Sequence, residues 1–148
     1  CRMVHGVLGS QTEIQAIVVA GNNADLKARI DRLADSDRIL SLGFVDDMDL
    51  LMDAADIVVG KAGGLTVSES LAKKKPLFIV NPVPGQEEFN TRILSRAGAA
   101  VWVRDLSALD GMISQYMNDS ARRAQIQRAI LDYSHPDAAR QIAADLIQ

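Results

Sequence analysis

Apolar runs and helical periodicity alternate along the chain, and this alternation predicts its secondary structure. Short runs of Val, Ile, Leu and Ala that are almost continuously apolar are typical of parallel strands covered on both faces. Strands are predicted at residues 14–21, 38–44, 56–60, 76–80 and 99–103. Each run is followed by Gly or a polar turn, as expected where a buried strand ends.

Helices are predicted between these strands. Leu26, Ile30 and Leu33 are spaced at i, i+4 and i+7, which places them on one helix face. Asp46 is a candidate N-cap of the second helix, and Gly98 is a candidate C′ residue of the fourth. The predicted helices span residues 24–35, 46–55, 65–74 and 86–97 and, after the last strand, 107–117, 121–131 and 137–147.

Strand–helix alternation predicts an α/β fold, a Rossmann-like doubly wound parallel sheet with right-handed crossovers and C-terminal helices. Without repeats or linkers, residues 1–148 are expected to form a single domain. Residues 2–13, "RMVHGVLGSQTE", have the pattern of a helix end leading into the first strand. A βαβ unit needs a strand before that helix. The sheet is therefore expected to lack its first, interior strand, and the chain to be a fragment of a longer protein.

Composition and charge limit the kinds of partner that this chain can bind. Of the 148 residues, 48 % are hydrophobic and 24 % charged, which is ordinary for a globular domain. The formal net charge of −3 argues against broad nucleic-acid binding, so an anionic ligand must be held by local positive potential. No apolar run is long enough to span a bilayer. The single cysteine, Cys1, favours a reducing compartment.

The first chemically suggestive stretch is "GKAGGLTVSE", residues 60–69, where a strand turns into a helix. Gly63 and Gly64 have no Cβ, so the backbone can approach an anion closely. The N–H groups of Leu65, Thr66 and Val67 then point ahead of the helix, at its positive end. This arrangement predicts a phosphate site.

Two other interpretations of this stretch stay open. Thr66 and Glu69 have the T-x-x-E spacing of a capping box, in which Glu69 only closes the helix end. A Gly-Gly pair before a helix also serves as a simple turn. Lys61 adds a positive charge nearby.

The second stretch is "NPVPGQEEFN", residues 81–90, a rigid exit from the next strand. It delivers Gln86, Glu87, Glu88 and Asn90 to the first turn of a helix. Amide and carboxylate groups match sugar hydroxyls, which both donate and accept hydrogen bonds. The alternative is that the acidic residues only stabilise the helix dipole.

Together, "GGLTVSESLA" and "NPVPGQEEFN" resemble the donor-binding signature of glycosyltransferase family 28. The likeness is closest to its lipid branch, the monogalactosyldiacylglycerol synthases and processive diacylglycerol glucosyltransferases. The stretch "GFVDDMDLLMDAADIVVGKAGGLTVSE" also resembles the bacterial N-acetylglucosaminyltransferase that makes the peptidoglycan lipid intermediate. The resemblance covers nearly the whole chain.

The resemblance implies the C-terminal half of a GT-B enzyme, the domain that binds the nucleotide-sugar. It implies that Gly63, Gly64, Leu65 and Thr66 bind the diphosphate of the donor. It also implies that Glu69 binds the ribose.

The same resemblance assigns the two ends of the donor. Phe44 and Val45 are expected to bind the uracil. Gln86, Glu87 and Asn90 are expected to bind the hexose of UDP-glucose or UDP-galactose.

The activity implied is an inverting hexosyl transfer to a lipid acceptor of the diacylglycerol type, with no metal and no cofactor. The acceptor and the general base are expected in the missing N-terminal domain, so this chain has no catalytic residue and is expected to be inactive alone. The full protein would be cytoplasmic and peripheral at the inner face of the membrane. A peptidoglycan-type donor domain, a non-catalytic nucleotide-binding module and a nucleotide-sugar epimerase remain alternatives.

Trp102, in the last predicted strand, is interpreted as core packing. Lys73 to Lys75 are interpreted as charges that suit a helix C-terminus.

Overall fold

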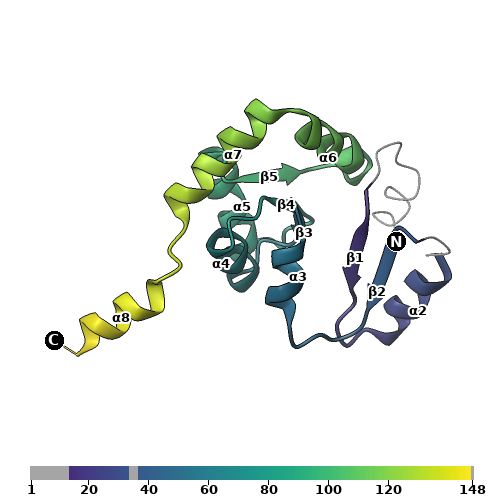
Figure 1. Ribbon diagram of the computed structural model, residues 1–148, viewed down its shortest axis with the longest axis horizontal. Helices are drawn as coiled ribbons and strands as arrows, with labels where there is room; N and C mark the ends of the chain where they lie inside the picture. Colours follow the sequence, from purple (N-terminus) through teal and green to yellow (C-terminus); the bar gives the residue numbers. More distant parts are fainter. Residues whose placement is uncertain (1–13, 34–36, 148) are drawn as a thin grey trace. The chain divides into compact units, whose positions relative to one another are not determined.

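The computed structural model describes residues 14–33 and 37–147 (Figure 1). The helix end predicted at residues 2–13 lies outside the described residues. The chain divides into two compact units. Unit 1 comprises Cys1–Leu51 and Asp105–Asp119, and unit 2 comprises Met52–Arg104 and Ser120–Gln148.

Unit 1 is built on two parallel strands, β1 (Ala16–Val19) and β2 (Ile39–Leu42), joined by helix α2 (Ala24–Leu33). Ile30 of α2 and Ile39 of β2 form a buried hydrophobic cluster in this unit. The predicted stripe on α2 is confirmed, because Leu26 and Leu33 pack against the same cluster. The short 3-10 helix η1 (Leu106–Ala108) and helix α6 (Leu109–Asn118) also belong to this unit.

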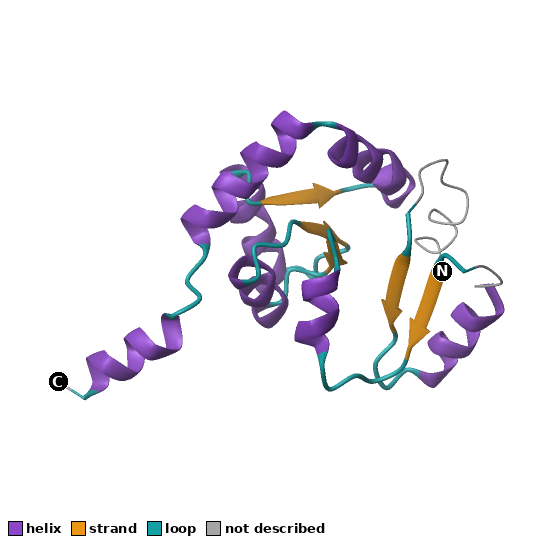
Figure 2. Cartoon of the chain, viewed as in Figure 1, coloured by secondary structure: helices purple, strands orange, loops and turns teal. Residues whose placement is uncertain are grey.

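Unit 2 contains a three-stranded parallel sheet, drawn in orange in Figure 2, with the order β3-β4-β5. Its strands are β3 (Val58–Gly60), β4 (Leu77–Val80) and β5 (Ala100–Val103). All four residues of β4 are buried, because this strand is central and covered on both faces. That position explains why its sequence is continuously apolar rather than alternating.

The helices of unit 2 are α4 (Gly64–Ala72), α5 (Gln86–Ala97), α7 (Ser120–Tyr133) and α8 (Ala138–Leu146). Helix α3 (Met48–Ala54) spans the boundary between the units. Ile126 and Ile130 bury one face of α7, which contacts α4. Gly98 ends α5 in the left-handed region at φ 76°, as predicted.

The predicted α/β class, its parallel strands and its C-terminal helices are confirmed. The described strands form a pair and a triplet rather than one sheet. Helix α3 begins at Met48, so Asp47 and not Asp46 directly precedes it.

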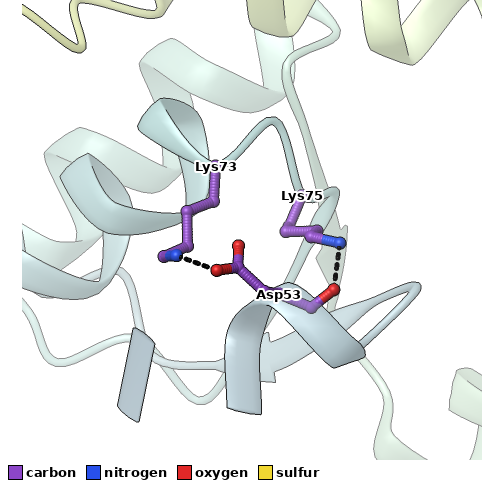
Figure 3. A network of polar contacts seen from close by, with 3 residues as sticks. All are labelled: Asp53, Lys73 and Lys75. Atoms are coloured by element: carbon purple, nitrogen blue, oxygen red, sulfur yellow. Dashed lines mark hydrogen bonds and ion pairs between the residues drawn. The ribbon is translucent and has the colours of Figure 1, made fainter. Parts of the chain in front are cut away.

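The C-terminal ends of α3 and α4 are joined by a small polar network (Figure 3). Lys73 Nζ lies 2.5 Å from Asp53 Oδ2, and Lys75 Nζ donates to Asp53 O at 2.9 Å. Both lysines therefore bind the end of α3 instead of only complementing the dipole of their own helix. Between them Lys74 has φ 56°, which turns the chain toward β4.

Candidate functional site

The two polar turns singled out in the sequence follow neighbouring strands of unit 2. The first turn (residues 60–63) follows β3 and begins α4, and the second turn (residues 81–85) follows β4 and begins α5. Because β3 and β4 are paired in parallel, both turns leave the sheet at the same edge. This is the edge where open α/β sheets bind ligands.

Direct contacts join the two segments. Asn90 Nδ2, on α5, donates to the carbonyl oxygen of Ala62 at 2.9 Å. Ala62 is completely buried, so this bond satisfies a carbonyl inside the protein. A Cβ built on Gly63 would lie 3.9 Å from Glu87 Oε1, which places that carboxylate beside the start of α4.

The N-terminus of α4 carries no side-chain cap. Gly63 is the N-cap residue, with extended φ −64° and ψ 150°, and the N–H of Val67 donates to its carbonyl at 2.9 Å. Within the described part of the chain, no hydrogen bond uses the N–H groups of Gly64, Leu65 or Thr66. The helix therefore presents three backbone donors at its positive end.

This geometry corrects two expectations. The capping-box interpretation is wrong, because Thr66 lies inside the first turn of α4 and not at its N-cap. Glu69 consequently does not close the helix end, and it is exposed in the second turn. The N–H of Val67 is not free, because Gly63 accepts it.

The surroundings of this helix end are open to a ligand. Leu65 is 80 % exposed, and Lys61 is exposed in the same turn. A cation at this point adds to the field of the helix N-terminus. An anion of suitable size can therefore reach the three backbone donors.

The second turn is held rigidly by its own hydrogen bonds. Glu87 Oε2 accepts the N–H of Val83 at 2.7 Å, and Thr91 Oγ1 donates to Glu87 O at 2.6 Å. Gly85 at φ 102° and Asn81 at φ 45° make the reversal between β4 and α5. The carboxylate of Glu87 is thus fixed in orientation, with Oε1 on the side of the first turn.

The site residues predicted in the second turn divide into two groups. Gln86 is exposed at the first position of α5, and Glu87 lies beside Gly63. The side-chain amide of Asn90 donates to the carbonyl oxygen of Ala62, so it forms a structural bond within the protein. No sequence pattern pointed to Ala62, because its role depends on a backbone carbonyl. Buried Thr91 was missed for the same reason.

Phe44 and Val45 belong to unit 1, where they follow β2. Phe44 is 66 % exposed, and Val45 is half-buried. In the loop of residues 21–23, which follows β1, Asn23 Oδ1 accepts the N–H of Leu26 at 2.9 Å, as an N-cap does.

In the described ranges, no group of three or more His, Cys, Asp or Glu side chains could hold a metal ion. No described helix has the length and apolar character needed to cross a bilayer.

Comparison with protein families identifies the fold and its relatives. The model of the glycosyltransferase family 28 C-terminal domain matches residues 2–142. A processive diacylglycerol beta-glucosyltransferase of Bacillus mycoides (strain KBAB4) is 32 % identical over 155 residues, which cover 97 % of this chain and 40 % of that protein. The homologue of Bacillus anthracis (strain CDC 684 / NRRL 3495) is 31 % identical with the same coverage. The chain thus spans about two fifths of the length of these relatives.

Solved structures share the fold at lower identity. MurG of Acinetobacter baumannii aligns over 99 % of this chain and 44 % of its own chain, at a TM-score of 0.71 and 21 % identity. VinC, crystallised in complex with DTDP, aligns over 97 % of this chain and 36 % of its own chain, at a TM-score of 0.69 and 18 % identity. The architecture is therefore that of the C-terminal half of GT-B glycosyltransferases.

Proposed function

Because the chain belongs to glycosyltransferase family 28, as its C-terminal domain, we propose that it binds the UDP-sugar donor of a hexosyltransferase that acts on a diacylglycerol-type lipid. The observation that carries the proposal is the uncapped N-terminus of α4, held beside the α5 turn by the bond from Asn90 to Ala62. The 32 % identity to processive diacylglycerol glucosyltransferases supports the choice of a lipid acceptor.

The diphosphate of the donor is assigned to the start of α4. The N–H groups of Gly64, Leu65 and Thr66 converge on the point where the helix carries roughly half a positive charge. Negative charge builds on the diphosphate as the sugar leaves, and donors that are already oriented stabilise it without reorganisation. One such donor is worth roughly 3 to 4 kcal/mol in the transition state. VinC, which has the same fold, was crystallised in complex with DTDP, which supports a pyrimidine nucleoside diphosphate here.

The sugars of the donor are assigned to polar side chains around this helix end. Glu69, exposed one turn along α4, accepts hydrogen bonds from the ribose hydroxyls. Gln86 and Glu87 bind the hexose, which must lie next to the diphosphate and so between the two turns. Asn90 acts through Ala62 and the first turn rather than on the sugar.

The uracil is assigned to Phe44 and Val45. An aromatic side chain that is 66 % exposed offers its face to a base, and backbone groups at Val45 can bond its edge.

The chemistry of the whole enzyme is proposed from its family. An acceptor hydroxyl attacks the anomeric carbon, the bond to UDP breaks, and the configuration inverts, without a metal or a cofactor. The general base and the lipid-binding surface would lie in a segment outside these 148 residues, so this chain holds no catalytic residue. The enzyme would act at the cytoplasmic face of the membrane as a peripheral protein.

Calorimetric titration tests donor binding. The chain should bind UDP, and Glu69→Ala should weaken binding by roughly tenfold or more, since a lost charged hydrogen bond costs about 1.5 to 3 kcal/mol. Asp132→Ala is the matched control, because Asp132 is an exposed carboxylate on α7 of the same unit, and it should bind like the wild type.

Comparing the affinities of several UDP-sugars distinguishes the candidate functions. Preference for UDP-glucose or UDP-galactose supports the glycolipid enzyme, whereas preference for UDP-N-acetylglucosamine supports the peptidoglycan-type alternative. If the folded chain binds no uridine ligand, the proposal of donor binding is contradicted.

A further inference from the structure

A pocket lies in unit 2 on residues that the proposed donor site does not use. It has a volume of about 420 Å³, within the range of small-molecule sites. Helix α5 and strand β5, which contact each other, supply its walls. We call it the arginine pocket; it is lined by Arg92, Ser95, Arg96, Trp102 and Arg104.

The spacing of the sequence explains why these side chains converge. Arg92 and Arg96 are four residues apart on α5 and so share one helix face. Trp102 and Arg104 are two residues apart along β5 and its extension, and so share one face of the strand. Because β5 is an edge strand of its sheet, this face can open to solvent.

The pocket concentrates positive charge on a chain whose net charge is −3. Arg92 is paired with Glu88 at 2.5 Å, but neither Arg96 nor Arg104 forms an ion pair with a described residue. Two guanidinium groups therefore remain uncompensated at one small site. Planar guanidinium forks match the oxygens of a phosphate group.

The remaining lining residues favour a ligand over a purely structural role. The guanidinium of Arg104 lies 4.4 Å from the centre of the Trp102 ring, which orients it without using its N–H donors. Ser95 Oγ is buried and has no hydrogen-bond partner in the described part of the chain. A rotation about χ1 would offer this hydroxyl to a bound oxygen.

The geometry points to a second ligand site: the arginine pocket binds a phosphate group, held by Arg96 and Arg104 with Ser95. Trp102, interpreted from the sequence as core packing, is half-buried and lines this pocket. The phosphate can come from a small phosphorylated molecule or from the head group of an anionic phospholipid.

Fluorescence tests the site directly, because Trp102 is the single tryptophan of the chain. Titration with glycerol 3-phosphate or inorganic phosphate should change its emission saturably, and glycerol alone should not. Arg96→Gln and Arg104→Gln should each weaken binding by roughly tenfold or more. Arg128→Gln removes an equal charge from an exposed position on α7 and should bind like the wild type.

Vesicles distinguish the two sources of phosphate. If the ligand is a lipid head group, the chain should sediment with phosphatidylcholine vesicles only when they contain phosphatidylglycerol, and Arg96→Gln should abolish this. Matching thermal melts of all variants exclude unfolding as the cause. The proposal is overturned if no phosphate probe or vesicle binds, or if Arg128→Gln weakens binding as much as Arg96→Gln. Glu69→Ala should not alter these results, so the donor site is tested separately.

Discussion

Asn90 donates its side-chain amide to the carbonyl oxygen of Ala62, 28 positions earlier in the chain. This bond holds the turn before α4 against the first turns of α5. Ala62 is fully buried, so neither a water molecule nor another protein group can easily replace the Asn90 amide as its donor. The placement of the α4 donors therefore depends on a residue that is not expected to touch the ligand.

Asn90→Ala should destabilise the chain by about 2 kcal/mol, because it removes a hydrogen bond and leaves a buried carbonyl unsatisfied. It should also weaken UDP binding, since the α4 turn loses its support. Urea denaturation followed by Trp102 emission measures the first effect, and calorimetry measures the second.

Asn118→Ala is the control for this prediction. Asn118 also donates its amide to a carbonyl, that of Ser114 at 2.9 Å, but at an exposed position on α6. Its loss should cost about 0.5 kcal/mol or less. Equal midpoints for the two variants would show that the bond from Asn90 does not stabilise the turn.

Some site residues could be predicted from the sequence and others could not. The role of Gly63 and Gly64 at the start of α4 follows from local rules, because a Gly-Gly pair between a strand and a helix is a local signal. The partner of Asn90 is a backbone atom on another element, which no residue type encodes. The same limit applies to Trp102, whose exposure depends on β5 being an edge strand.

At the scale of elements, α5 is the helix whose limits are best defined. Gly85 at φ 102° precedes it and Gly98 at φ 76° ends it, so a residue with positive φ stands at each end. The N–H of Gly98 and that of Ala99 donate to carbonyls of the last turn. These ends set the position of Gln86 at the site and of Arg96 in the arginine pocket.

Gly98→Ala should lower the free energy of unfolding by about 1 to 2 kcal/mol, because a Cβ disfavours the left-handed region. The added methyl would lie 3.8 Å from Ala129 Cβ, an ordinary contact, so the cost comes from the backbone alone. Thermal melting of the variant measures it.

Gly64→Ala is the matched substitution in the same unit. Gly64 has no positive φ, and a Cβ there would meet nothing within 4 Å. Its stability should stay within about 0.5 kcal/mol of the wild type. A loss as large as that of Gly98→Ala would contradict the assignment of strain to positive φ.

Element types were predicted better than element ends. The continuous apolar run of β4 and the stripe on α2 are strong periodic signals, and both elements form as predicted. The start of α4 was predicted as a possible capping box at Thr66, but the helix begins at Gly64. Backbone geometry at Gly63, rather than a side chain, decides that boundary.

At the scale of the molecule, the parallel direction of the described strands was predictable but their pairing was not. Each strand–helix–strand segment implies parallel strands locally. Which strands pair is decided by long-range contacts that no local pattern encodes, and among the described strands β2 pairs with β1 alone.

The proposal assigns donor binding to this chain and the general base and acceptor site to another segment. It therefore predicts that the chain binds the donor without transferring sugar. The 148-residue chain incubated with UDP-glucose and diacylglycerol should yield no glucosyl lipid by mass spectrometry, because the base and acceptor site lie elsewhere. Formation of product that Glu69→Ala abolishes would place the whole reaction in this chain and contradict the proposal.

The central claim is that the open N-terminus of α4 and the α5 turn together hold one nucleotide-sugar. Amide-resolved NMR titration with UDP-glucose tests it most directly. The account predicts saturable shifts of the backbone N–H signals of Gly64, Leu65 and Thr66, together with the side-chain amide of Gln86. Saturable binding that leaves these four signals unmoved, or no binding at all, would contradict it.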